Sequence, residues 1–161
     1  MEPSVEKESA RTRLLGLGNE ILADDAFGIL VAREVERRIP RQIEVVCSAA
    51  AGFNLMEDML GVSNLIVVDT IVTGAARPGT LHVLSVDQIG VSPCVAPHFL
   101  GLAEVLAVGR RLRLIVPETT VLIAVEAADC ATIGGVMHPD VKSAISEAVA
   151  LVRRLVADGC H

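Results

Sequence analysis

The sequence predicts an α/β fold, a three-layer sandwich in which a twisted, largely parallel five-stranded sheet lies between helices. Short apolar runs rich in β-branched residues alternate with longer amphipathic stretches from residue 13 to residue 157, the pattern of strands connected by helices. Aromatic residues make up 2% of the chain, so Val, Leu, Ile and Ala have to build the core. At 161 residues the chain has the length of one domain. We expect a loose N-terminal leader at residues 1–11 and a single α/β domain over residues 12–161.

The first half of the chain predicts three strands and two helices. Residues 13–18 form a short apolar run that ends in glycine, as expected of a buried strand that enters a tight turn. Residues 27–39 have apolar side chains at helical spacing, and Pro40 ends this helix. Almost all of residues 64–72 are apolar, which is typical of a central strand covered on both faces. The other elements of this half are a strand over 43–47 and a short helix over 55–60.

The second half predicts two further strands and two longer helices. Residues 77–80 (RPGT) have the composition of a turn, and a strand over 81–86 follows them. Residues 98–112 form a helix with arginines near its end, where cations interact favourably with the helix dipole. The remaining elements are a strand over 119–125 and a long amphipathic helix over 139–157.

Charge and composition exclude several classes of protein. Fourteen Lys and Arg stand against twenty Asp and Glu, a net charge of −6, which is the wrong sign for a protein that binds nucleic-acid phosphates. No apolar run reaches the length of a membrane span. The four cysteines include no C-x-x-C pair, which predicts free, mostly buried thiols in a reducing cytoplasm. We expect a cytoplasmic protein with no nucleic-acid partner and no membrane partner, and the oligomeric state stays open.

Gly16-Leu17-Gly18, directly after the first strand, invites comparison with a dinucleotide-binding turn. The G-x-G-x-x-G pattern fails because Ile21 stands where the third glycine is needed. Glu20 and the pair Asp24-Asp25 would also repel a pyrophosphate at the start of the next helix. A nucleotide cofactor is therefore not expected.

Three side chains with metal-binding chemistry stand on different loops at the expected edge of the sheet. The loops after parallel strands meet at one edge, where such folds bind their ligands. Asp24 is expected to cap the next helix, which leaves Asp25 free to point elsewhere. Asp69 ends a buried strand, where a carboxylate is costly unless it is paired, hydrogen-bonded or bound to a metal. Together with His98, which opens a helix, Asp25 and Asp69 supply two oxygens and one nitrogen for Zn²⁺, Ni²⁺ or a similar divalent ion.

Simpler explanations and weaker candidates remain beside this set. Asp69 could instead accept hydrogen bonds from the amides of the next loop, and His98 could merely open its helix. His82 alternates along a strand and is expected to face solvent, and His138 is expected to begin the last helix. Cys130, after the fifth strand, is the thiol best placed to meet a metal or substrate. The sequence contains no G-x-S-x-G nucleophile elbow.

Several segments resemble a known family. Residues 16–28 (GLGNEILADDAFG) are similar to the opening of the hydrogenase maturation endopeptidases, in which a G-x-G-N turn precedes an acidic pair and a glycine. The resemblance continues through residues 65–70 (LIVVDT), 77–80 (RPGT) and 96–106 (APHFLGLAEVL). It covers nearly the whole chain in unbroken order and implies the family's fold, a twisted sheet between helices.

The resemblance also implies an activity, a cofactor and a partner. Members of the family remove a short C-terminal extension from the precursor of the nickel-containing large subunit of a [NiFe] hydrogenase, after nickel insertion. Their metal ligands are an acid after the first strand, an aspartate that ends the third strand and a histidine, which correspond by motif position to Asp25, Asp69 and His98. The resemblance therefore implies that this chain is a metal-dependent endopeptidase whose catalytic residues are these three. Its implied partner is the hydrogenase large-subunit precursor, and its implied metal is nickel, which the precursor itself can bring.

Two loops depart from the family pattern. Residues 47–52 (CSAAAG) follow the second strand, where an Asp-Gly-Gly-Thr-like turn is common, and residues 124–127 (AVEA) stand where a Gly-Ile-x-Pro-like stretch is usual. Both loops border the expected site. Two alternatives therefore stay open: a nickel-dependent binding or checkpoint protein that has lost hydrolysis, and a small-molecule metal hydrolase on a similar sheet.

Overall fold

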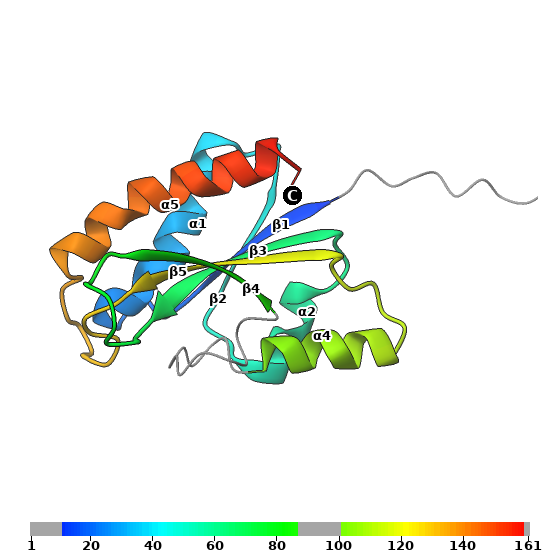
Figure 1. The fold of residues 1–161 in the computed structure, drawn as a ribbon, viewed down its shortest axis with the longest axis horizontal. Coiled ribbons are helices and arrows are strands. Elements are labelled where there is room, and N and C mark those ends of the chain that lie inside the picture. Colours follow the sequence, from blue (N-terminus) through cyan, green and yellow to red (C-terminus); the bar gives the residue numbers. More distant parts are fainter. Residues whose placement is uncertain (1–10, 87–100, 160–161) are drawn as a thin grey trace, which may run out of the picture.

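The sheet has five strands in the order β2-β1-β3-β5-β4. The computed structural model describes residues 11–86 and 101–159. The parallel strands β1, β2, β3 and β5 form the body of the sheet, and β4 is antiparallel to β5 at one edge (Figure 1). The bounds of the strands are β1 (Thr12–Leu17), β2 (Glu44–Ser48), β3 (Asn64–Ile71), β4 (Leu81–Ser85) and β5 (Thr119–Glu126). The predicted α/β fold with a largely parallel five-stranded sheet is confirmed.

Helices cover both faces of this sheet and complete the three layers (Figure 1). On one face lie α1 (Phe27–Arg38) and α5 (Pro139–Ala157), and on the other lie α2 (Met56–Met59) and α4 (Leu102–Arg111). The central strand β3 serves both cores, because Ile66 and Val68 pack toward α1 and α5 whereas Leu65 and Val67 pack toward α2 and α4. This alternation explains why the strand is apolar along its whole length.

The strand β4 runs against the direction expected of it. In a fully parallel sheet, the strand over residues 81–86 would end at the carboxyl edge. In the structure, Ser85 pairs with Val121 near the start of β5, so β4 ends at the amino edge. The connection from β3 to β4 covers only residues 72–80, which is too short for the crossover of a dozen or more residues that a parallel pair needs. The length of this connection was the signal for an antiparallel strand.

Close backbone packing places the turn after β1 against the sheet. This turn contains the short 3-10 helix η1 (Ala23–Ala26). A side chain at Gly18 would overlap the carbonyl oxygen of Asp25, and one at Gly28 would overlap the carbonyl oxygens of Leu17 and Val68. The absence of these side chains lets η1 and the start of α1 lie directly on the ends of β1 and β3.

The cysteines and the absence of a membrane span were also the subject of expectations. Cys47 and Cys130 are free, but Cys47 is exposed rather than buried, because it lies in the edge strand β2. The other two cysteines lie outside the described residues. Within the described ranges, no helix has the length and apolar character that crossing a membrane requires.

Candidate functional site

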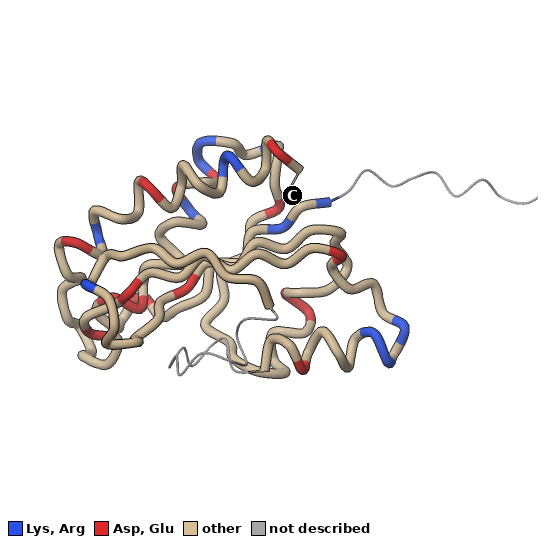
Figure 2. The backbone as a smooth tube through the Cα atoms, viewed as in Figure 1, with Lys and Arg blue, Asp and Glu red and all other residues tan. Residues whose placement is uncertain are grey.

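Buried polar side chains gather at the carboxyl ends of the parallel strands. In the described part of the chain, every buried polar or charged residue belongs to this edge, and none is more than 5% exposed. Figure 2 shows acidic residues at the end of the molecule where β3 and β5 terminate. The residues are Asp24, Asp25, Asp69, Thr70 and Glu126. Because a buried carboxylate is costly unless other groups stabilise it, each of these acids needs a structural or functional explanation.

Thr70 connects the two acids that the sequence analysis singled out. Its backbone N–H donates a hydrogen bond of 2.7 Å to Oδ1 of Asp69, and its hydroxyl donates one of 3.2 Å to Oδ1 of Asp25. Asp25 comes from η1, and Asp69 lies near the end of the strand β3, two residues before its last residue, Ile71. The structure therefore brings these two carboxylates, which are far apart in the sequence, onto one residue.

The chemistry of Asp25 and Asp69 fits a divalent ion. Carboxylate oxygens are good ligands for such ions, and a buried pair of acids is the kind of site that a cation stabilises. In residues 11–86 and 101–159, no group of three or more His, Cys, Asp or Glu side chains forms a metal-binding cluster. The third expected ligand, His98, lies outside the described residues. The described part of the chain thus supplies two carboxylates of the expected set.

Asp24 has a different role from the helix cap that was expected. The N-cap of α1 is Ala26, and no side chain caps this helix. Instead, both carboxylate oxygens of Asp24 accept hydrogen bonds from backbone N–H groups of the segment that follows β5. The bonds are 2.8 Å from Ala128, 2.9 Å from Asp129 and 2.6 Å from His138. Asp24 is the internal anchor of this segment.

His138 was expected to begin the last helix, and this prediction is confirmed. It is the N-cap of α5, and its ring accepts a hydrogen bond of 3.2 Å from the backbone N–H of Asp140.

Glu126 is a buried acid to which the sequence analysis assigned no role. It is the last residue of β5, and its carboxylate holds the loop after β3. Burial alone would raise the pKa of Glu126, but hydrogen bonds from the Thr73 hydroxyl and from the amides of Thr73 and Gly74 lower it below its ordinary value. A glutamate at the end of a buried strand, like Asp69, was the signal that could have identified it.

His82 was expected to face solvent, which is wrong. The side chain is 28% exposed, and its Nε2 lies 3.4 Å from Oε2 of Glu126. His82 lies on the same face of β4 as Leu84, which packs against the core on the side of α2 and α4, so this face of the strand is partly covered.

Cys130 lies beside the two acids as a neutral thiol. Its Sγ donates a 3.5 Å hydrogen bond to the Thr70 hydroxyl oxygen. Burial, together with the nearby carboxylates of Asp25, Asp24 and Asp69, raises the pKa of Cys130 to about 11, although the hydrogen bond to Thr70 lowers it. Because the thiolate is the reactive form of cysteine, this thiol is poorly suited to be a nucleophile at neutral pH.

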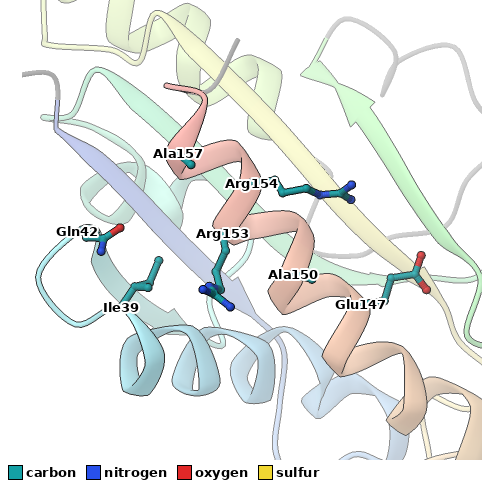
Figure 3. A pocket seen from close by; sticks show the side chains of 7 residues that line it. All are labelled: Ile39, Gln42, Glu147, Ala150, Arg153, Arg154 and Ala157. Atoms are coloured by element: carbon teal, nitrogen blue, oxygen red, sulfur yellow. The ribbon is translucent and has the colours of Figure 1, made fainter.

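A sizeable hollow in the described surface lies away from these acids. It has a volume of about 620 Å³ and lies between the end of α1 and the outer side of α5 (Figure 3). Its lining consists of Ile39, Gln42, Glu147, Ala150, Arg153, Arg154 and Ala157. None of the buried acids at the carboxyl edge takes part in it, so this hollow is not the candidate site.

The fold and its acidic edge define an α/β protein with a carboxylate site at the ends of its parallel strands, and comparison with known proteins identifies its family. The sequence profile of the HycI hydrogenase maturation proteases matches residues 29–155. This chain belongs to the hydrogenase maturation protease family, as its sequence motifs predicted.

Individual relatives agree with this assignment. The hydrogenase 2 maturation protease of Escherichia coli K12 is 35% identical over 101 residues, which cover 60% of this chain and 62% of the relative, less than two thirds of its length. The hydrogenase expression/formation protein HupD of Bradyrhizobium diazoefficiens is 28% identical over 92% of this chain and 79% of the relative. The solved structure of the hydrogenase maturating endopeptidase HybD from E. coli superposes with a TM-score of 0.78 and 30% identity, covering 92% of this chain and 94% of HybD.

Proposed function

We propose that this protein is a cytoplasmic endopeptidase that removes the C-terminal extension of a [NiFe] hydrogenase large-subunit precursor after nickel insertion. Family membership supports the class of reaction. The observation that carries the proposal is the contact of Thr70 with both Asp25 and Asp69, because it joins two buried carboxylates at the edge of the sheet where α/β proteins bind their ligands.

Asp25, Asp69 and His98 are the proposed ligands of a divalent ion, with nickel brought by the precursor as its source. When bound, such an ion supplies Lewis acidity toward a carbonyl group and a water molecule. The remaining work falls to the chain: Asp25 and Asp69 recognise the nickel-loaded precursor, and Thr70 holds both carboxylates in fixed orientations.

The position of α4 supports the inclusion of His98. Gly101, the N-cap of α4, lies against Gly52 in the loop after β2, because a Cβ at Gly101 would stand 3.0 Å from the Gly52 Cα. The start of α4 is therefore at the same edge of the sheet as Asp25 and Asp69. His98 precedes Gly101 by three residues, a length of chain that spans at most about 10 Å.

The test is cleavage of purified precursor. We expect the protein to shorten the nickel-loaded large-subunit precursor by its C-terminal extension, which mass spectrometry detects as one discrete loss of mass. The same precursor prepared without nickel should stay intact. Cleavage that is equally fast without nickel would contradict the nickel requirement. Stable binding of the nickel-loaded precursor without cleavage would instead support a checkpoint protein.

A further inference from the structure

Large apolar side chains are exposed around the acidic site. Ile21, in the loop after β1, is 59% exposed, and Ile133 and Val136, in the segment after β5, are 78% and 92% exposed. We call these three residues the apolar rim. Phe53, in the short 3-10 helix Gly52–Leu55 after β2, and Val72, directly after β3, add two further exposed apolar side chains. Exposed apolar groups gathered around a polar site are characteristic of surfaces that bind another protein.

The apolar rim stands on a rigid base. Leu22 forms a β-bridge with Ile133, which joins the loop after β1 to the segment after β5. The carboxylate of Asp24 fixes the same segment from inside through its three hydrogen bonds to backbone N–H groups. Further backbone bonds run from Gly134 N to Ile21 O (2.7 Å), from Asp24 N to Asp129 O (2.8 Å) and from Ala23 N to Thr132 O (3.3 Å). A surface that is already ordered loses little conformational entropy when it binds a partner.

The apolar rim is continuous with the site. Ile21 precedes Asp25 by four residues in the same loop. Cys130, which donates its thiol hydrogen to Thr70, precedes Ile133 by three residues in the other segment. Both segments that carry the rim therefore also carry residues at or beside the two buried carboxylates, and a polypeptide bound at the rim lies next to the loop that carries Asp25.

We infer that the apolar rim is the docking surface for aliphatic side chains of the hydrogenase large-subunit precursor. This inference rests on the proposed function and adds the part of the chain that recognises the substrate protein, separately from its metal. The precursor fits better than a second copy of this chain, because a second copy seated on the rim would obstruct the approach to Asp25. Apolar contacts at the rim would hold the precursor while its C-terminal segment enters the site.

The experiment replaces the rim residues together, as Ile21→Ser, Ile133→Ser and Val136→Ser. All three side chains are exposed, so the variant should fold with a nearly unchanged melting temperature. With nickel-loaded precursor as substrate, we expect KM to rise about tenfold or more while kcat stays within about twofold. The matched control is Leu112→Ser with Ile115→Ser, because these residues are 61% and 68% exposed but precede β5 at the opposite edge of the sheet.

The outcomes distinguish a failure of the docking-surface inference from a failure of the proposed endopeptidase function. Efficient cleavage with an unchanged KM in the rim variant would overturn the docking surface and leave the endopeptidase standing. An equal rise in KM for the control variant would also overturn it. A wild-type dimer that the rim substitutions convert to a monomer in sedimentation would assign the rim to self-association. If wild-type protein cleaves no precursor, the proposed function fails. The affinities of the wild type and the rim variant for nickel-loaded precursor are then compared: weaker binding by the variant supports the docking surface, and equal binding overturns it.

Discussion

At the scale of single residues, Thr70 connects the parts of the site. Its hydroxyl accepts a hydrogen bond from Cys130 and donates one to Asp25, whereas its amide donates to Asp69. The substitution Thr70→Val removes only the hydroxyl bonds and keeps the amide. We expect a loss of about 1–2 kcal/mol in the free energy of unfolding and a fall of tenfold or more in the cleavage rate, because Asp25 loses a donor that orients it.

The matched control for this prediction is Thr70→Ser, which keeps the hydroxyl and loses one methyl group. It should restore most of the cleavage rate. Cleavage of the precursor by the Thr70→Val variant at the wild-type rate would show that the hydroxyl does not orient the site.

Asp24 should matter for stability, since it holds the segment after β5. In the variant Asp24→Asn, an NH₂ group has to replace one carboxylate oxygen, and at least one of the three backbone N–H donors then loses its acceptor. We expect the free energy of unfolding in urea to fall by about 2–3 kcal/mol. The exposed Asp158→Asn control should change it by less than about 0.5 kcal/mol. Equal stability of the two variants would contradict this assignment of Asp24.

Sequence reasoning identified some of these residues and not others for physical reasons. Asp69 was recognisable because an acid inside an apolar strand is costly. The contact between Asp25 and Thr70 was not, because it depends on how closely η1 packs onto the end of β3. Asp24 was misassigned because the backbone N–H groups that donate to it lie more than a hundred residues away, on a segment whose path no local pattern reveals.

At the scale of elements, Glu126 ties the end of β5 to the loop after β3. The pKa of Glu126 is lowered in the folded protein, so the charged form is favoured by folding. Its contribution to stability is full above the ordinary glutamate pKa and is lost as the pH falls through the lower folded-state value. Measured by urea unfolding, the stability difference between wild type and Glu126→Gln should therefore shrink between about pH 6 and about pH 3. A difference that is independent of pH would contradict this role.

The helices and strands themselves were largely predictable. Most described elements begin and end within about one residue of the predicted ranges, because apolar periodicity and turn residues mark them clearly. The exception is α4, which was predicted from residue 98 but begins at Leu102, after the left-handed N-cap Gly101. The direction of β4 was not read from its own sequence, since a strand looks the same in either direction. Only the short connection from β3 determines that it returns antiparallel.

At the scale of the whole molecule, two apolar cores hold the sheet between its helices, and the buried polar residues lie at the carboxyl edge. The core on the side of α1 and α5 and the core on the side of α2 and α4 contain no buried acid among the described residues. This separation lets substitutions at the acidic edge alter chemistry without removing the apolar core. Asp69→Asn is the clearest case, because an asparagine oxygen can still accept the bond from the Thr70 amide.

The most direct test of the central claim is the mass of the hydrogenase large subunit from cells that lack this gene and carry a replacement copy. With wild-type protein or the Asp158→Asn control, we expect the mature, shortened subunit. With Asp69→Asn, produced at a normal level, we expect the precursor that retains its C-terminal extension. A subunit of mature mass in the Asp69→Asn cells would contradict the account, because processing would then not depend on the buried carboxylate at the end of β3.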